Sequence, residues 1–219
     1  TAADPDSGFP EETRHGVPLG VDEQLYLPRE IWPPKLNEDP TPEEDPCNAD
    51  NYPSAEEHAD LMEKTYMEER ALGMTDGPYE TREEVARICG VPLEKVCAGA
   101  LGARVEKDKI RTVHDGTVNH VNPWIQKNLP GKTTAPRVAD LLMAAKHLEH
   151  QGREFAILKT DVKKAHRRIK IMKKDWGYTI AQLKGKYWIN KCGTYGVSSA
   201  QWYWGRMAAL LLRLTYSLS

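Results

Sequence analysis

Asp161 is the residue of this chain whose surroundings most suggest chemistry. It follows a short apolar run at 155–158, and six basic residues stand around it: Lys159, Lys163, Lys164, Arg167, Arg168 and Lys170. A carboxylate at the tip of a buried strand can hold a metal ion without being buried unpaired, and Mg²⁺ prefers oxygen ligands. An acid among cations is also typical of a structural ion pair. From these residues alone, both interpretations stay open.

A second segment, Gly193 to Ala200, combines glycine with serine further along the chain. Gly196 permits a positive φ or a close approach of the backbone to a ligand. Ser198 or Ser199 can cap a following helix, whose N-terminal N–H groups could face a phosphate or a base. A plain strand-to-helix turn needs the same glycine and the same cap, so the segment alone does not establish a binding site.

A third segment, Arg111 to Asn122, lies upstream of the other two. We expect a β-hairpin at its start, turning at 106–109. Lys109 and Arg111 on such a hairpin could hold a triphosphate, the lysine as a point charge and the arginine as a planar fork of donors. Asp115 and the neighbouring asparagines are typical turn residues.

In this order, the three segments resemble the fingers and palm of a retroelement reverse transcriptase. The patterns of that family are Arg-x-Val-His-Asp, then Asp-Val-x-Lys-Ala-aromatic-x-x-Ile, then Phe/Gln-Gly-x-x-Ser-Ala. The matching sequences here are Arg111-Thr-Val-His-Asp115, Asp161-Val-Lys-Lys-Ala-His-Arg-Arg-Ile169 and Tyr195-Gly-Val-Ser-Ser-Ala200. No single segment is decisive, but the order, the separations and the expected elements make the set specific. The resemblance covers residues 54–219.

The resemblance implies a metal-dependent polymerase site. Asp161 would be the catalytic residue and would bind a pair of Mg²⁺ ions with the help of the Val162 carbonyl. Two such ions activate the primer 3′-hydroxyl and stabilise the leaving pyrophosphate in an in-line displacement. The implied activity is that of an RNA-directed DNA polymerase, a nucleotidyltransferase that adds nucleotides to an RNA or DNA template-primer.

The resemblance also implies a binding site for nucleoside triphosphates. Arg111, with Lys109 or Arg104, would hold the phosphates. Tyr195 and Gly196 would border the nascent base pair and the template.

The chain departs from the family pattern at two places. His166 stands where the family has Tyr or Phe, the ring that borders the nucleotide sugar and excludes a 2′-hydroxyl, so sugar discrimination is in doubt. The aspartate pair of the family, usually Tyr-x-Asp-Asp on a palm hairpin, is absent, and no acid follows Asp175. The chain stops at Ser219, about where the segment before that motif would lie. A two-metal site needs a second carboxylate, so we expect this chain alone to be inactive.

Three interpretations therefore stay open. The chain is a piece of a longer polymerase polyprotein, or it is a catalytically dead relic. In a second interpretation it is a non-catalytic nucleic-acid-binding or assembly module that keeps the polymerase-like fold. In a third it is a structural subunit of a larger complex.

The elements needed to position these segments predict an α+β fold, with fingers and a partial palm of helices packed on a small antiparallel sheet. Strands are expected at 103–105, 110–113, 155–158, 178–183 and 187–192, the last two joined by a turn at Lys184-Gly185. Helices are expected at 54–73, 81–90, 136–150 and from Ser198 or Ser199 to Leu218. Capping boxes, Ser54 with Glu57 and Thr81 with Glu84, begin the first two helices. Apolar residues at a spacing of three to four predict one buried face for 136–150.

Composition and the resemblance together divide the chain into three regions. Residues 1–53 hold 10 of the 15 prolines and many acids, which predicts an extended acidic arm or linker, with local packing through Leu25, Tyr26, Ile31 and Trp32. The resemblance, and not composition, implies fingers at residues 54–135 and a palm at residues 136–219 that is truncated before the second aspartate motif. Residues 1–100 carry 24 acidic and 8 basic residues, whereas 101–219 carry 8 acidic and 22 basic ones. This asymmetry suggests a half that binds a polyanion, unless the two halves neutralise each other.

Other patterns in the sequence are weaker indications of function. His147 and His150 could bind a metal with Asp140, but exposed histidines on a polar helix face are the more common case. Trp202 and Tyr203 could stack on bases, although core packing is the expected use of at least one of them. The four cysteines match no zinc pattern, which favours a reduced, intracellular setting in the cytoplasm or nucleus. No apolar run is long enough to span a membrane, so no membrane partner is expected.

Overall fold

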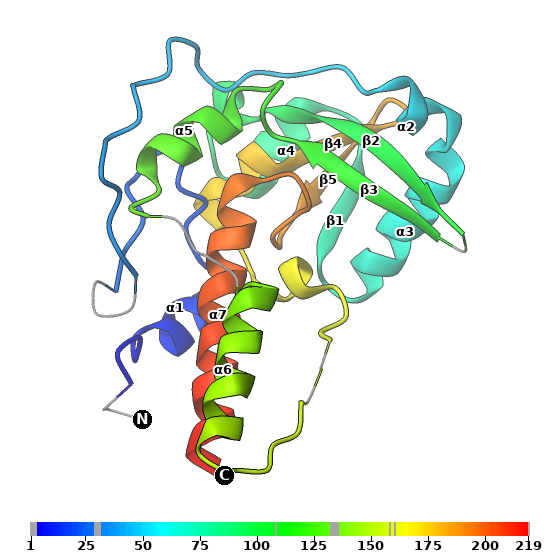
Figure 1. Ribbon diagram of the computed structural model, residues 1–219. Coiled ribbons are helices and arrows are strands. Elements are labelled where there is room, and N and C mark those ends of the chain that lie inside the picture. Colours follow the sequence, from blue (N-terminus) through cyan, green and yellow to red (C-terminus); the bar gives the residue numbers. More distant parts are fainter. Residues whose placement is uncertain are drawn as a thin grey trace.

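The computed structural model describes residues 4–28, 32–107, 109–131, 136–157, 159 and 161–218, and only the backbone of residues 109 and 216–218. The fold is α+β around one five-stranded sheet of order β1-β5-β4-β2-β3 (Figure 1). The strands are β1 (Thr75–Tyr79), β2 (Ala98–Glu106), β3 (Lys109–Asp115), β4 (Ile180–Leu183) and β5 (Lys186–Asn190). The predicted α+β class is confirmed. The sheet is mixed rather than antiparallel, because β2 and β4 run parallel.

Two predicted hairpins form the centre of this sheet. In the first, β2 and β3 pair antiparallel, with Arg104 opposite Arg111. In the second, β4 and β5 are joined by Lys184 and Gly185, whose φ angles of 51° and 74° suit the tight turn of a two-residue hairpin. The expected strand at 178–183 begins only at residue 180, because the short 3₁₀ helix η3 (Lys173–Thr179) precedes it.

Three helices from the N-terminal half of the chain pack against the sheet: α2 (Pro53–Glu57), α3 (Ala59–Ala71) and α4 (Arg82–Cys89). The prediction of a single helix at 54–73 is wrong, because the helix is interrupted at His58, between α2 and α3. The capping box at Ser54 is also wrong, because its hydroxyl accepts the N–H of Ala103 on β2. The cap of α4 is confirmed, with the Thr81 hydroxyl accepting the Glu84 N–H at 3.2 Å. A short 3₁₀ helix, η1 (Leu93–Lys95), leads into β2.

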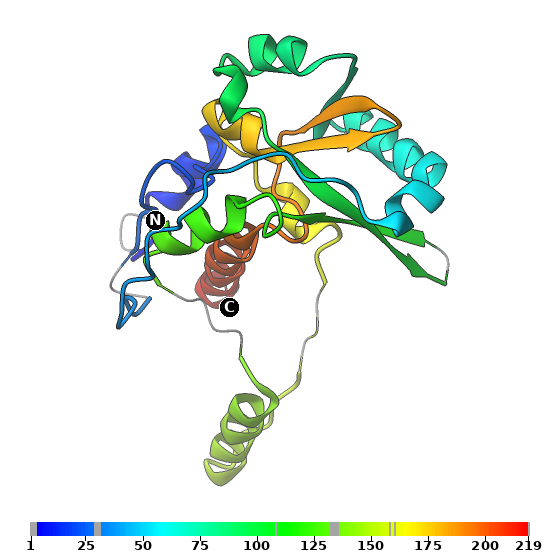
Figure 2. The same ribbon diagram turned by 90° about the horizontal axis from the view of Figure 1, so that it is seen from above.

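Helix α6 (Val138–His150) matches the predicted span, but its apolar face is not buried. Val138 is 74% exposed and Leu142 56% exposed, and Figure 2 shows the helix standing apart from the rest of the molecule. The strand expected at 155–158 is wrong for its described residues: 155–157 form no strand. No described strand lies beside them to accept their backbone hydrogen bonds, so Phe155 and Ile157 stay exposed.

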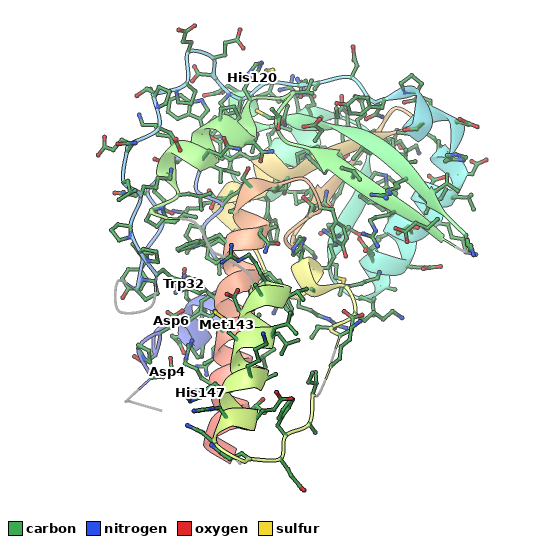
Figure 3. The ribbon with its side chains drawn as sticks, viewed as in Figure 1. Asp4, Asp6, Trp32, His120, Met143 and His147 are labelled. Carbon is green, nitrogen blue, oxygen red and sulfur yellow. The ribbon has the colours of Figure 1, made fainter. Side chains whose placement is uncertain are left out.

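The first part of the N-terminal segment enters the core, where an extended arm with only local packing was expected. Helix α1 (Phe9–His15) buries Phe9, and Val17, Leu19 and Leu25 are buried beyond it. Buried ion pairs compensate for the polar composition of this segment. Asp6 bonds to Arg206 through both carboxylate oxygens, at 2.9 and 3.0 Å, and Figure 3 places Asp4 and Asp6 beside the last helix.

Residues 32–52, which we call the strap, do run extended over the surface, along the top of Figure 1. The strap crosses the beginning of α5 (Val121–Asn128) and continues beside β2. The Glu44 carbonyl accepts the indole N–H of Trp124 at 2.9 Å, and the Glu44 carboxylate lies 3.0 Å from His120, which is labelled in Figure 3.

The last helix, α7 (Ser198–Leu218), is half core and half surface. Trp202 and Tyr203 are buried, which confirms the expectation that core packing uses at least one of them. Leu211, Leu212 and Leu214 are exposed, so the end of this helix presents an apolar face to solvent. No helix in the described part of the chain has the length and apolarity needed to cross a membrane.

Candidate functional site

A pocket of about 430 Å³ lies between the inner face of β3, the C-terminal half of α3 and the segment that carries Asp161. It brings together one residue from each of the three sequence segments: Arg111, Asp161 and Tyr195. Val162 also lines the pocket. The short 3₁₀ helix η2 (Ala165–Arg168) and residues 190–195 complete its wall.

Asp161 lies at the mouth of this pocket with its side chain exposed. Its carboxylate makes no hydrogen bond or ion pair with any side chain or backbone group that the structure describes. The expected position at the tip of a strand is wrong, because residues 161–162 follow an extended segment without strand pairing. An exposed, unpaired carboxylate at a pocket mouth is free to contact a ligand or a cation.

The ion pair of this pocket instead joins two other residues. Glu69 on α3 contacts the Arg167 guanidinium at 2.5 Å and the Lys164 ammonium at 3.0 Å. Arg167 is 4% exposed, and it also donates to the Asn190 side-chain oxygen at 3.0 Å. The pocket lining carries four cations, Arg111, Lys163, Lys164 and Arg167, against two carboxylates, Glu69 and Asp161, so its net charge is positive.

An aromatic wall stands on the other side of the pocket. The Arg111 guanidinium lies 5.3 Å from the centre of the Tyr195 ring, and the His166 ring, which does not line the pocket, lies 5.1 Å from the Tyr195 ring. Arg111 also contacts Glu106 at 3.1 Å. Burial lowers the pKa of His166, and a hydrogen bond to Gln201 partly opposes this shift. At neutral pH this wall presents one arginine and one phenol ring, and the imidazole that contacts the phenol ring is neutral.

The other predicted nucleotide-binding residues lie around the pocket without lining it. Gly196 follows Tyr195 with a φ of 98°, and a β-carbon there would come within 2.3 Å of the His114 carbonyl oxygen. Glycine is therefore required for packing at this position. Arg104 is exposed on β2, opposite Arg111. The side chain of Lys109 lies outside the described part of the chain.

His114 forms the buried floor of the pocket and was not singled out by the sequence analysis. It is 1% exposed, and neither ring nitrogen has a hydrogen-bond partner among the described residues. Burial, followed by the nearby Arg167 charge, lowers the pKa of His114 to about 4. The imidazole packs against Gly99, where a β-carbon would lie 2.0 Å from Nε2.

The sequence also did not predict the ion pair between Glu69 and Arg167. Arg167 appears in sequence only as one of several cations near Asp161, and Glu69 as one of several acids on a helix. No spacing rule connects two residues so far apart in sequence, so the pair becomes visible only in three dimensions.

The metal interpretation requires a second carboxylate near Asp161. Glu69 is the other acid lining the pocket, and it is occupied by Arg167 and Lys164. Within the described ranges, no group of three histidine, cysteine or acidic side chains is close enough together to hold a metal ion. The described residues therefore do not fit a two-metal site. His147 is exposed on α6 and contacts Gln151 at 3.0 Å.

Comparison with known proteins leaves the pocket as the main evidence. No protein-family model matches the chain, and no curated protein matches it. The functional argument therefore depends on the residues themselves and on their arrangement.

Proposed function

We propose that this chain binds a nucleoside triphosphate in the pocket between β3, α3 and η2, as part of a reverse-transcriptase-like polymerase domain. The observation that supports the proposal is the meeting of Arg111, Asp161 and Tyr195 in one pocket. They come from three segments that are distant in sequence, and each segment resembles a polymerase motif. Meeting by chance at one pocket is a poor explanation for three such segments.

The pocket has the charge and the surfaces that such a ligand needs. The phosphates would lie against Arg111 at the mouth, with Lys163 and Lys164 as further cations. The Tyr195 ring offers a flat apolar face for a base or a sugar. Glu69 would hold Arg167 and Lys164 in place, because it contacts both of them.

Transfer of a nucleotide is the reaction that the resemblance implies for the complete enzyme. Bound Mg²⁺ would supply charge stabilisation and activation of a hydroxyl in that reaction. Since the described residues offer one unpaired carboxylate at the pocket, we assign binding of the nucleotide to this chain and derive no transfer step for it.

Titration with a fluorescent deoxynucleoside triphosphate in EDTA tests the pocket. Arg111→Gln removes a guanidinium that would contact the phosphates, and we expect binding to weaken about tenfold. The matched control is Arg168→Gln, because Arg168 is exposed and lies outside the pocket lining. The control should bind as wild type does. Equal losses in both variants would mean that only overall charge matters, and the proposal would fail.

Asp161→Asn gives a test whose sign depends on the metal. In EDTA the carboxylate repels the triphosphate, so the variant should bind more tightly than wild type. With Mg²⁺ present, an Asp161 that contacts the ion should reverse this order, and the variant should bind more weakly. Unchanged affinity under both conditions would show that Asp161 does not face the ligand.

A second candidate function is binding of nucleic acid without catalysis, and the exposed cations beside the pocket favour it. Five basic side chains between positions 159 and 173 are exposed and make no ion pair with a described residue: Lys159, Lys163, Arg168, Lys170 and Lys173. Phosphate contacts release counterions, so such binding weakens steeply as salt rises. A primer–template that binds in this way but leaves triphosphate binding undetectable would favour this second function.

A further inference from the structure

The strap brings a cysteine beside the start of β2. The N–H of Ala49 donates to the Ala98 carbonyl at 2.9 Å, and the N–H of Tyr52 donates to the Leu101 carbonyl at 2.9 Å. Both hydrogen bonds have the same offset in residue number, so the strap runs in the same direction as β2. Ala98 in turn donates its N–H to the Asn48 side chain at 2.9 Å. This register places Cys47, just before Asn48, next to Cys97, just before Ala98.

The thiol of Cys97 faces the strap. Its Sγ lies 3.3 Å from the carbonyl oxygen of Pro46, the residue that directly precedes Cys47. Cys97 is 1% exposed, whereas Cys47 is exposed. The two thiols are also close enough to interact electrostatically, because the charge of a Cys47 thiolate contributes to raising the pKa of Cys97. An accessible thiol thus lies beside a buried one.

We propose that Cys47 and Cys97 form a reversible disulfide that fastens the strap to β2. The proposal requires the two α-carbons to lie within the 4.4–6.8 Å that a disulfide spans, and the Ala49–Ala98 hydrogen bond and the 3.3 Å contact of the Cys97 Sγ with Pro46 support this closeness. The hydrogen bond from the Cys47 N–H to the Asn119 carbonyl, at 3.0 Å, holds Cys47 in place. Formation of the bond needs the two side chains to rotate toward each other and no large movement of the backbone.

The oxidant is a hydroperoxide, and the reaction takes two steps. The exposed Cys47 thiolate attacks the peroxide, forms a sulfenic acid and releases water or an alcohol after protonation. Cys97 then attacks the sulfenic sulfur, the S–S bond forms, and hydroxide leaves and takes up the proton lost by Cys97. Two thiols lose two electrons in total, and the O–O bond of the peroxide gains them.

The second step should depend on pH. Burial raises the pKa of Cys97 to about 11, so little of its thiolate is present at neutral pH. Closure should therefore accelerate about tenfold for each unit of pH between 7 and 9, because the thiolate fraction rises in that proportion. A rise that continues through pH 9 distinguishes resolution by Cys97 from oxidation of a thiol with the reference pKa of about 8.5, whose thiolate fraction is already levelling off there.

Thiol counting on the full chain tests the disulfide. The reduced protein carries four thiols after denaturation. After treatment with hydrogen peroxide at low protein concentration, we expect two thiols to remain, with the Cys47 and Cys97 peptides linked in a map made without reductant. Dithiothreitol should restore all four. A linked pair that involves Cys89 or Cys192, a dimer linked through Cys47, or a Cys47 oxidised while Cys97 stays free would each overturn the proposal.

Cys47→Ser is the matched variant, because the side chain it changes is exposed and the fold should not depend on it. It should form no intramolecular disulfide under the same treatment. Oxidation should raise the melting temperature of wild type by about 5 °C or more, since closing a loop of this length restricts the unfolded chain. The variant should show no such rise. An equal rise in both proteins would contradict the proposal, whatever the outcome of the nucleotide titrations.

Discussion

The β4–β5 hairpin and helix α6 are both amphipathic by sequence, yet only the hairpin has a partner. Leu183 on β4 is 1% exposed and Trp188 on β5 is fully buried, where it packs 5.3 Å from the Tyr66 ring of α3. Leu142 on α6 is 56% exposed, and none of the α6 residues is buried. The hairpin packs against another element of the fold, whereas the described structure offers α6 no such surface. The two regions do not differ in how apolar they are.

This difference teaches what periodicity can and cannot establish. Apolar residues at every third or fourth position specify a helix with one apolar face, and α6 forms over the expected residues. Burial of that face depends on a second surface, which no local pattern encodes. The same reasoning applies at 155–157, where an apolar run has no strand beside it in the described structure and remains irregular.

The largest expected effect comes from truncating one leucine in each region. Leu183→Ala removes side-chain atoms from a packed core and should lower the free energy of unfolding by about 2–5 kcal/mol. Leu142→Ala should change it by less than about 0.5 kcal/mol, because the side chain is already exposed. Urea denaturation of both variants measures the difference. A large loss for Leu142→Ala would mean that α6 packs on another surface in solution.

Acid should destabilise the packed region through His114. Burial holds the pKa of His114 at about 4 in the folded protein, below its ordinary value of 6.5. The unfolded state therefore binds more protons, and stability falls as pH decreases from about 6.5 to 4, by up to roughly 3 kcal/mol in total, then levels off. Denaturation at several pH values measures this slope.

His114→Leu should flatten the slope between pH 6.5 and 4, because the buried site no longer takes up a proton on unfolding. The control is His147→Gln on α6, whose side chain is exposed and whose variant should keep the wild-type profile. If His114→Leu keeps the wild-type slope, another group is responsible for the acid sensitivity.

Disturbing the contact between Gly99 and His114 should cause a loss of stability of intermediate size. Gly99→Ala would place a β-carbon 2.0 Å from the His114 ring, inside a packed sheet. Overpacking of this kind costs about 1–3 kcal/mol. Gly8→Ala is the matched control, since a β-carbon at Gly8 meets nothing within 4 Å. The double variant Gly99→Ala, His114→Ala should lose less than the sum of its two single variants, and exact additivity would argue against the contact.

Local signals in the sequence were sufficient for most of the elements around the pocket. The Lys184–Gly185 turn, the Thr81 cap and the hairpin of β2 and β3 each follow from neighbouring residues, and each is confirmed. Ser54 shows the limit of such signals. Its position suits a helix cap, but its hydroxyl bonds to β2, a partner that the local sequence does not reveal.

The pocket was predictable only in part, for the same reason. Arg111, Asp161 and Tyr195 lie in segments with recognisable patterns, and the structure brings them together. Their supporting residues lie elsewhere in the sequence. The Glu69–Arg167 pair depends on η2 lying beside α3, and the burial of His114 depends on its contact with Gly99 of β2. Buried ion pairs and desolvated histidines are consequences of tertiary structure, so composition cannot reveal them.

The smallest effect compares the caps of a packed and an unpacked helix. Thr81→Ala removes the cap of α4, whose residues Val85 and Cys89 are buried, and should lower the free energy of unfolding by about 1 kcal/mol. Asp140→Ala removes the carboxylate that accepts the Arg137 N–H at 2.7 Å, at the start of α6. Because α6 gains no stability from packing, this change should leave global unfolding within about 0.3 kcal/mol of wild type.

Hydrogen exchange should nevertheless detect the loss of the α6 cap. An unpacked helix of 13 residues is only marginally stable, so Asp140→Ala should accelerate amide exchange in α6 several-fold and leave α4 unchanged. Thr81→Ala should instead accelerate exchange wherever it requires global unfolding. If Asp140→Ala lowered global stability as much as Thr81→Ala does, α6 would unfold together with the sheet, and the contrast between the two regions would disappear.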